Sequence, residues 1–308
     1  MPLLRCPLTG EPLHWEGGLL VSESARTSYG ISDSGIPLFA ESFCSREALI
    51  QQRHYDEIAD AYAANLNYPH TIEYMTYLDE VLREAVSAED LGVVAEVCCG
   101  KGEAFALFKD SIRTGVGVDV SLSMLSKGQS SLDNACLYFV QGDATQMPLA
   151  ENSFDAVMML GGIHHVPDRS ALFQEVFKIL KPGGVFIWRE PVSDFWLWKI
   201  LRSVVYRLSP ILDHGTERPL TWDETVPPLE ESGFEVQQWR TCGFLGFCIF
   251  MNSDVLYFNR LFRFVPGIRH ITRAFTRFDN WCTGLPGLRR AGLQVVGKAV
   301  KPDEVREA

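Results

Sequence analysis

The chain of 308 residues is acidic and moderately apolar, with a net charge of −11 and 46% apolar residues. This acidity argues against general nucleic-acid binding, and the apolar content is enough for one large α/β domain with appendages. No uncharged apolar run reaches the roughly 18 residues of a membrane span, and the N-terminus lacks the apolar core of a signal peptide. The eight cysteines include no CxxC pair. We therefore expect a cytoplasmic protein with reduced thiols and no metal site.

Residues 1–44 contain short apolar runs separated by glycine and serine. The runs are Leu13–Trp15, Leu19–Val21, Tyr29–Ile31 and Ile36–Phe39. This pattern predicts a small β-module ahead of the main domain.

Residues 45–308 are expected to form the main α/β domain. Helical patterns run from Ser45 to about Leu66 and from His70 to Val86. From Val93 onward, short apolar runs alternate with helical segments, which is typical of βαβ units and a parallel sheet. Strands are predicted at Val93–Cys98, Gly115–Asp119, Cys136–Gln141, Phe154–Leu160, Gly184–Glu190, Phe234–Thr241 and Leu293–Val300, with helices at residues 103–110, 121–131, 169–180 and 221–233. The predicted fold is a Rossmann-like, mostly parallel seven-stranded sheet with helices on both faces.

The stretch from Glu96 to Gly102 reads Glu-Val-Cys-Cys-Gly-Lys-Gly. It combines an acid near the end of a predicted strand with a small-residue turn into a helix. Gly100 and Gly102 have no Cβ, so the backbone there can approach a ligand closely. Asp119 ends the second predicted strand, where a carboxylate can accept hydrogen bonds from both hydroxyls of a ribose. A Gly-x-Gly turn alone also occurs in plain strand-to-helix connections.

Three further motifs follow along the predicted strands: Gly142-Asp143-Ala144, Phe154-Asp155-Ala156-Val157 and Leu180-Lys181-Pro182-Gly183-Gly184. This ordered set resembles the class I S-adenosylmethionine-dependent methyltransferases, and within them the subgroup that includes the ubiquinone- and menaquinone-biosynthesis methyltransferases. The resemblance covers roughly residues 55–300 and implies S-adenosyl-L-methionine as cofactor. It implies transfer to the oxygen or carbon of a small acceptor.

For the methionine end of the cofactor, the resemblance implies that Glu96 orients the glycine loop and the amino group. Gly100 and Gly102 would line the methionine moiety. The family usually has glycine where this chain has Cys98, whose small side chain can be accommodated. Tyr62 resembles the family's N-terminal lid helix over the cofactor, although aromatic packing in the core also explains it.

For the nucleoside end, the resemblance implies that Asp119 holds the ribose hydroxyls, with Val120 and Met124 beside the adenine. Asp143 would accept a hydrogen bond from the adenine amino group, and Ala144 would contribute backbone. Asp119 and Asp143 can also be read as plain helix caps, because aspartate is favoured at that position.

The acceptor is expected beyond the carboxyl end of the fourth strand of the main domain. His164 and His165 lie there, and either can serve as a general base for a hydroxyl acceptor because imidazole titrates near neutral pH. The alternative is that one packs against the cofactor and the other caps the next helix. Glu190, at the end of the fifth strand, is a third candidate. An acceptor without a proton to lose needs none of them.

Two apolar insertions that carry cations are expected to be helical, at about residues 195–219 and 247–288. In the second, Ile268, Ile271, Phe275 and Phe278 share one predicted face, and Arg269, Arg273 and Arg277 share another. No Asp or Glu occurs between Val255 and Phe278. Such a helix can rest on a membrane surface, or it can form a lid ahead of the last strand. Both interpretations favour a hydrophobic acceptor.

Two other functions compete with methyl transfer. A nucleotide-dependent oxidoreductase predicts a Gly-x-Gly-x-x-Gly turn, but Phe105 stands where the third glycine would be. A cofactor-binding scaffold without transfer activity is the non-enzymatic alternative, favoured only by Cys98. At the N-terminus, Cys6-Pro7-Leu8-Thr9-Gly10 resembles the zinc-ribbon-derived module found ahead of some methyltransferases. Thr9 replaces the ribbon's second cysteine, which predicts a module without zinc.

Overall fold

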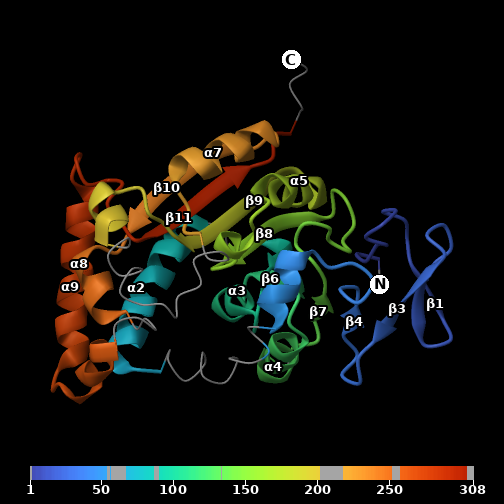
Figure 1. Cartoon of the computed structure of the whole chain (residues 1–308), viewed down its shortest axis with the longest axis horizontal. Coiled ribbons are helices and arrows are strands. Elements are labelled where there is room, and N and C mark those ends of the chain that lie inside the picture. Colours follow the sequence, from blue (N-terminus) through green and yellow to red (C-terminus); the bar gives the residue numbers. More distant parts are fainter. Residues whose placement is uncertain are drawn as a thin grey trace.

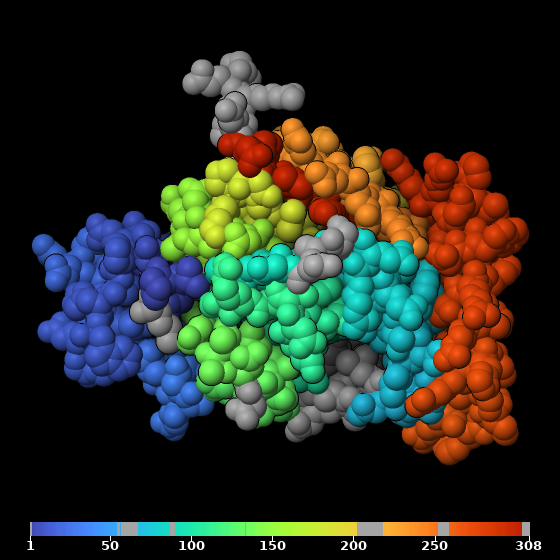
Figure 2. All heavy atoms as spheres, turned by 180° about the vertical axis from the view of Figure 1, so that it is seen from behind, coloured from blue at the N-terminus to red at the C-terminus, as the bar shows by residue number. Residues whose placement is uncertain are grey.

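The computed structural model describes residues 2–53, 56, 67–86, 90–132, 134–201, 218–251 and 257–303. A central sheet carries helices on both faces (Figure 1). Figure 2 shows the N-terminal residues at one end of the molecule and residues 257–284 at the other. The predicted α/β class with a mostly parallel central sheet is confirmed. Among the described residues, no helix is both long enough and apolar enough to cross a membrane.

The sheet contains eleven strands in the described residues. They are β1 (His14–Glu16), β2 (Leu19–Ser22), β3 (Thr27–Ile31), β4 (Pro37–Leu38), β5 (Gly92–Val97), β6 (Ile112–Asp119), β7 (Leu137–Gln141), β8 (Phe154–Leu160), β9 (Leu180–Pro191), β10 (Glu235–Cys242) and β11 (Gln294–Val300). Their order across the sheet is β1-β2-β3-β4-β7-β6-β5-β8-β9-β11-β10. β7, β6, β5, β8 and β9 run parallel, and β11 lies antiparallel between β9 and β10. The chain therefore changes direction across the sheet between β5 and β8.

The predicted count of seven strands is wrong because the N-terminal strands join the same sheet. Leu38 of β4 pairs with Gln141 of β7, and the backbone N–H of Phe39 donates to the carbonyl oxygen of Gln141 at 2.9 Å. Without β4, β7 would be an edge strand with unpaired backbone groups. The hydrophobic pattern predicts the N-terminal strands, but it does not show that they pair with the β7 edge of the main sheet.

Helices cover both faces of the sheet. They are α2 (Pro69–Val86), α3 (Glu103–Leu107), α4 (Leu122–Leu132), α5 (Arg169–Ile179), α7 (Trp222–Glu231), α8 (Leu245–Phe250) and α9 (Ile268–Gly284), with 3-10 helices η1 (Ile163–His165) and η2 (Tyr257–Phe264). In β8, Ala156 and Met158 belong to the apolar core under α2, α3 and α4, whereas Val157 and Met159 belong to the core under α5 and α7. This period-two alternation is what a strand buried on both faces requires.

Several predicted boundaries shift. β9 begins at Leu180 rather than Gly184, and α3 ends at Leu107 rather than Asp110. Thr221 is the N-cap residue of α7, but its side chain makes no capping hydrogen bond. Ser45 does cap a helix over residues 46–53, because its Oγ accepts from the N–H of Ala48 at 3.2 Å. Most of that helix's predicted remainder lies outside the described residues.

Helices α8 and α9 are attached to the body of the protein by the buried carboxylate of Asp279. It accepts hydrogen bonds from the hydroxyl of Tyr74 in α2 at 2.5 Å and from the N–H groups of Phe244, Gly246 and Phe247 at 2.8–3.0 Å. This arrangement satisfies the free N–H groups at the start of α8. α9 is therefore held against α2 and α8 by a polar contact.

The expected apolar face of α9 is split in the structure. Ile268 is buried and Phe275 is half-buried, but Ile271 and Phe278 are exposed. The helical spacing places these four residues along one side of α9, but that side is only partly buried, because the helix also packs inward through Asp279 and several threonines.

Candidate functional site

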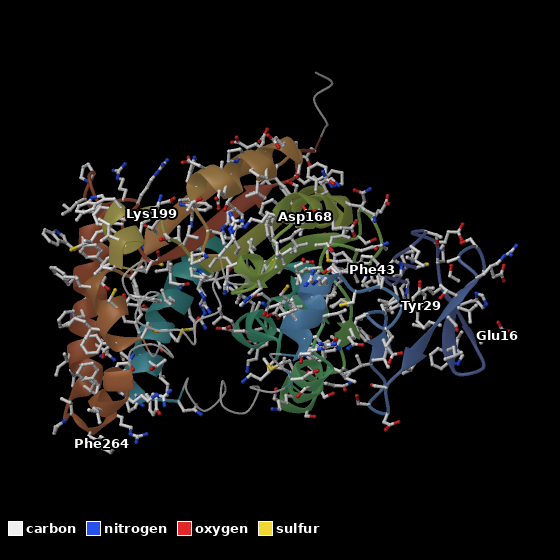
Figure 3. The ribbon with its side chains drawn as sticks, in the orientation of Figure 1. Glu16, Tyr29, Phe43, Asp168, Lys199 and Phe264 are labelled. Atoms are coloured by element: carbon white, nitrogen blue, oxygen red, sulfur yellow. The ribbon has the colours of Figure 1, made fainter. Side chains whose placement is uncertain are left out.

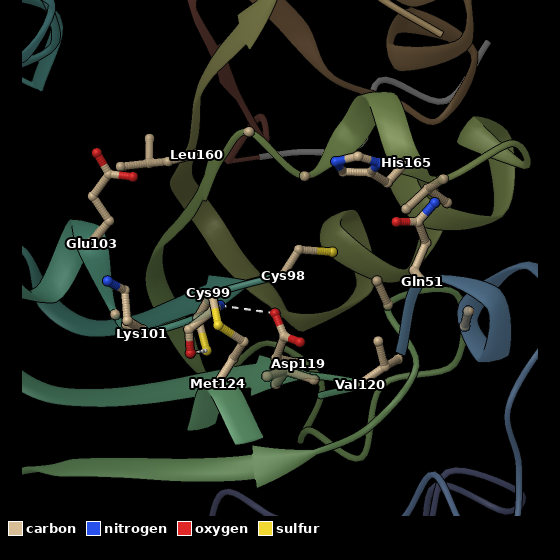
Figure 4. Close-up of a pocket in the computed structure, with 18 of the residues that line it drawn as sticks. Gln51, Cys98, Cys99, Lys101, Glu103, Asp119, Val120, Met124, Leu160 and His165 are labelled. Atoms are coloured by element: carbon tan, nitrogen blue, oxygen red, sulfur yellow. Dashed lines mark hydrogen bonds between the residues drawn. The ribbon is translucent and has the colours of Figure 1, made fainter. Parts of the chain in front are cut away.

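A cavity of about 1080 Å³ lies at the carboxyl ends of β5, β6, β7 and β8 (Figure 4). The helix over residues 46–53 and one face of α2 complete its wall. It sits where the chain changes direction between β5 and β8, and open α/β sheets bind ligands at such switch points. Small-molecule pockets measure about 300–1000 Å³, so this cavity has room for a cofactor together with a second molecule.

The turn from β5 into α3 forms one wall of the cavity. Cys98, Gly100 and Gly102 all line it, and all three have positive φ angles, of 50°, 51° and 80°. A Cβ on Gly100 would lie 3.2 Å from the terminal methyl of Met124, which also lines the cavity. Glycine is needed here because the chain both adopts a left-handed conformation and approaches a neighbouring side chain closely.

Glu96 is buried beneath this turn and does not line the cavity in the described structure. Its two carboxylate oxygens accept hydrogen bonds from the N–H groups of Ala104 at 2.8 Å and Phe105 at 3.1 Å. Burial raises the pKa of Glu96 to about 8, while these two donors act in the opposite direction. Glu96 thus fixes the first turn of α3, as a carboxylate at a helix N-terminus does.

Asp119 lies at the end of β6 and faces the cavity (Figure 4). Its Oδ2 accepts from the N–H of Gly100 at 2.8 Å, and its Oδ1 accepts from the N–H of Ser121 at 2.9 Å. Burial raises the pKa of Asp119, against the effect of these donors. A carboxylate offers about four acceptor positions, so Asp119 can hold the turn and still accept from a ligand.

Asp143 follows β7 and is also buried at the cavity wall. Its Oδ1 accepts from the N–H and the hydroxyl of Thr145 at 2.8 and 2.7 Å, and its Oδ2 accepts from the N–H of Ser45 at 2.8 Å. It therefore connects β7 to the helix over residues 46–53. The other expected nucleoside contacts that line the cavity are Val120, Met124 and Ala144. Tyr62 lies outside the described residues.

The three candidate acid–base residues occupy different positions. His165 lines the cavity, whereas His164 and Glu190 are not among its lining residues in the described structure. The Glu190 carboxylate is fully buried, contacts His164 Nδ1 at 2.8 Å, and accepts from the N–H groups of Gly162 and Ile163 at 2.7 and 2.8 Å. The ring centroids of His164 and His165 are 3.8 Å apart. Glu190 thus organises η1, from which His165 reaches the cavity.

Sequence reasoning missed a charged network on the other side of the cavity. The buried guanidinium of Arg189 in β9 is paired with Asp79 of α2 at 2.6 Å and with Glu103 of α3 at 2.5 Å. Both carboxylates line the cavity beside Leu160 and Met75. The available signal was an arginine directly after the apolar run Val185–Trp188 of a predicted strand, because a buried charge requires partners.

The comparisons with known proteins agree with this geometry. Residues 95–188 match a family model described as a methyltransferase domain. A demethylmenaquinone methyltransferase of Staphylococcus aureus (strain MRSA252) is 38% identical over 110 residues, which cover 32% of this chain and 45% of the relative. The chain thus spans about half the length of the curated relatives that it matches.

Two solved structures share the fold. One is a chain from the Haloferax volcanii complex between the Trm112 methyltransferase activator and a methyltransferase, with TM-score 0.55, 18% identity, and coverage of 80% of this chain and 97% of that one. The other is an S-adenosylmethionine-dependent methyltransferase of Thermotoga maritima, with TM-score 0.53, 17% identity, and coverage of 81% and 99%. At these identities the likeness shows a common fold. The sequence matches add that residues 95–188 are similar to a methyltransferase domain.

Proposed function

We propose that the protein transfers a methyl group from S-adenosylmethionine to the oxygen or carbon of a small hydrophobic acceptor. The observation that carries the proposal is that Asp119, Asp143 and the glycine turn meet at one cavity, which has room for two ligands. That the acceptor is a small hydrophobic molecule is also part of the proposal.

The proposed cofactor contacts follow from the free acceptor positions around the cavity. Asp119 has two of about four positions occupied by backbone N–H groups, which leaves two for the ribose hydroxyls. Asp143 already accepts three hydrogen bonds and has one position left for the adenine amino group. Cys98, Gly100 and Gly102 face the methionine end, and Glu96 acts through α3 and the turn.

The proposed transfer needs a close and dry arrangement more than a reactive side chain. When bound, S-adenosylmethionine supplies an activated methyl group, and the protein holds the acceptor atom in line with it. If the acceptor is a hydroxyl, His165 is placed to remove its proton, because it alone of the three candidates lines the cavity. His164 and Glu190 then position the turn that carries it.

The side of the cavity formed by α2 favours a hydrophobic acceptor. Ile72 and Met75 of α2, Leu160 of β8 and Ala106 of α3 line the cavity, and the carboxylates beside them are neutralised by pairing with Arg189. The name of the 38% identical relative, a demethylmenaquinone methyltransferase, supports an acceptor of similar character. Because such molecules partition into bilayers, we propose a cytoplasmic protein in peripheral contact with a membrane.

We also propose that residues 1–44 are a small zinc-free β-module of zinc-ribbon ancestry, ahead of a methyltransferase domain over residues 45–308. In the described residues, Cys6 Sγ lies 3.1 Å from the hydroxyl of Tyr29, and the hydroxyl of Thr9 accepts from Ser24 at 3.3 Å. Hydrogen bonds inside the module thus occupy the positions where a ribbon would place metal ligands.

Calorimetric titration with S-adenosylmethionine tests the site. Asp119→Ala should weaken cofactor binding by about 1–3 kcal/mol, because it leaves buried hydroxyls without an acceptor. Asp155→Ala is the matched control, since Asp155 also accepts from a backbone N–H at 2.8 Å, that of Val93, but does not line the cavity. Equal affinity in both folded variants would remove Asp119 from the site.

Labelled S-adenosylmethionine, incubated with the protein and a lipid-soluble cell extract, tests the reaction. We expect a labelled product that partitions into organic solvent. Cofactor binding without transfer to any extract would instead support a scaffold, and binding of a nicotinamide nucleotide in its place would support an oxidoreductase.

A further inference from the structure

Helix α9 leaves large apolar side chains exposed while it buries several polar ones. Its buried residues are Ile268, Thr272, Thr276, Asp279, Cys282 and Thr283. Its exposed side carries Ile271, Phe278 and Trp281, which recur at spacings of seven and three residues and so form one continuous stripe. A helix on a water-exposed surface normally buries its large apolar residues. The exposed apolar stripe of α9 is therefore unexplained by the packing of the protein itself.

The 3-10 helix η2, which packs against α9, and the link between them also carry exposed apolar residues. Leu261, Phe264 and Val265 are exposed by 65%, 69% and 38%, against 62% for Trp281. Figure 3 shows these helices along the outer edge of the molecule, with Phe264 at one end of it. We call the residues Leu261, Phe264, Val265, Ile271, Phe278 and Trp281 the outer face.

Cations flank the outer face, and acids are absent from it. Arg269 and Arg277 are exposed on α9, and within the described part of the chain neither has an ion-pair partner. The third arginine of this helix, Arg273, is instead bound to Glu73 of α2 at 2.7 Å. Residues 255–278 contain no Asp or Glu, although the whole chain has a net charge of −11. The local charge is thus opposite to that of the molecule.

From these observations we infer that the outer face is a docking surface for an anionic phospholipid membrane. Aromatic and aliphatic side chains enter the boundary between headgroups and acyl chains, and Arg269 and Arg277 contact the phosphates. The proposed membrane contact is thus made by the outer face and requires anionic lipid. It rests on the exposure and charge of α9 and η2, so it does not depend on the transfer reaction.

The two other occupants of such a face fit less well. A lid would turn its apolar side to the cavity, but no described residue of α8, η2 or α9 lines it. A second copy of the chain, related by a twofold axis, would bring the same arginines together with no acid between them. An anionic lipid surface complements both the apolar stripe and the cations.

The location of the face connects it to the site. α2 lines the cavity through Ile72 and Met75, and it contacts α9 through Tyr74 and Glu73. If α9 lies on the membrane, α2 is the element that connects the membrane-bound helix to the cavity. The cavity would then lie close to the membrane, where a hydrophobic molecule is most concentrated.

Sedimentation of the whole protein with vesicles tests the inference without cofactor or acceptor. The parent should bind vesicles of mixed phosphatidylglycerol and phosphatidylcholine, and bind vesicles of phosphatidylcholine alone much more weakly. Replacing Arg269 and Arg277 by Gln should weaken the partition coefficient about five-fold per residue. Raising the salt from about 0.1 M to about 1 M should have a similar effect, because the screening length falls from about 10 Å to about 3 Å.

Phe278→Ser with Trp281→Ser should weaken partition by about ten-fold or more, because both rings lose their apolar environment. Trp15→Ser is the matched control: Trp15 is 64% exposed but lies in β1 at the opposite end of the molecule, so it should bind as the parent does. Failure of the folded parent to sediment with anionic vesicles overturns the inference. The inference is also overturned if the parent is a dimer and the variant with Phe278→Ser and Trp281→Ser is a monomer, because that outcome assigns the outer face to a second copy.

Discussion

At the scale of single residues, Cys98 shows strain at the cavity wall. It follows β5 with φ of 50°, a conformation that costs a residue with a Cβ about 1–2 kcal/mol. A Cβ on Gly162 would lie only 2.5 Å from the Cβ of Cys98. A side chain at position 98 therefore requires glycine at position 162. The turns after β5 and β8 pack so closely that only one of these two positions can carry a Cβ.

Cys98→Gly should raise the free energy of unfolding by about 0.5–1 kcal/mol, because the relief of backbone strain exceeds the extra entropy that glycine gives the unfolded chain. Urea denaturation measures this change. Cofactor affinity should stay within about two-fold of the parent. A loss of stability would mean that packing of the thiol outweighs the strain.

The two histidines after β8 give a kinetic prediction. If His165 is a general base, His165→Ala should lower turnover by about 10²–10⁴-fold with little change in cofactor affinity. His164→Ala should have a smaller effect, because His164 is held by Glu190 and does not line the cavity in the described structure. Steady-state kinetics on the identified acceptor will decide. Turnover of both variants within a few-fold of the parent would assign the pair to packing.

At the scale of elements, Asp279 is the contact that holds the α8–α9 region against α2. Asp279→Ala leaves several buried donors without an acceptor, which should cost about 3 kcal/mol. Hydrogen exchange of α8 amides should accelerate by about 100-fold, while β5 and β6 exchange as in the parent. Tyr74→Phe removes only one of these hydrogen bonds and should cost about 1 kcal/mol. Equal acceleration throughout the sheet would show that the region does not open separately.

Much of the fold could be predicted because its elements have strong local patterns. The range Phe154–Leu160 was predicted to the residue, since a short, almost wholly apolar run is bounded there by Asn152-Ser153 and Gly161-Gly162. The inward side of α9 could not be predicted, because a helical period separates two faces without saying which one is buried. Asp279 lies on the inward side because it meets four donors from other elements.

The residues of the candidate site also divide into those that the sequence predicted and those that it did not. The residues around the glycine turn, with Asp119 and Asp143, were predictable because each follows a strand of a parallel sheet, and those strand ends meet. Their roles toward a ligand stay predictions. Arg189 with Asp79 and Glu103 was missed, because the three come from separate elements and only the packing of α2 and α3 brings them together.

At the scale of the whole molecule, the cavity joins segments that are far apart in the chain. Ser45, Ala48 and Gln51 line it on one side, and the ends of four strands line it on the other. In the described structure, Asp143 bonds directly to Ser45 across this boundary. A ligand bound in the cavity should therefore stabilise the helix over residues 46–53 against local opening.

Limited trypsin digestion measures that effect, because Arg46 and Arg53 are exposed on this helix. Cleavage requires local unfolding, and a ligand that binds only the closed form lowers the open population by a factor of about 1 + [L]/Kd. With S-adenosylmethionine at about 100 times its Kd, cleavage after both arginines should slow about 100-fold. Cleavage after Arg26, exposed in the turn between β2 and β3, should be unchanged. The same cofactor concentration should protect Asp119→Ala less, and equal rates with and without cofactor would place this helix outside the binding site.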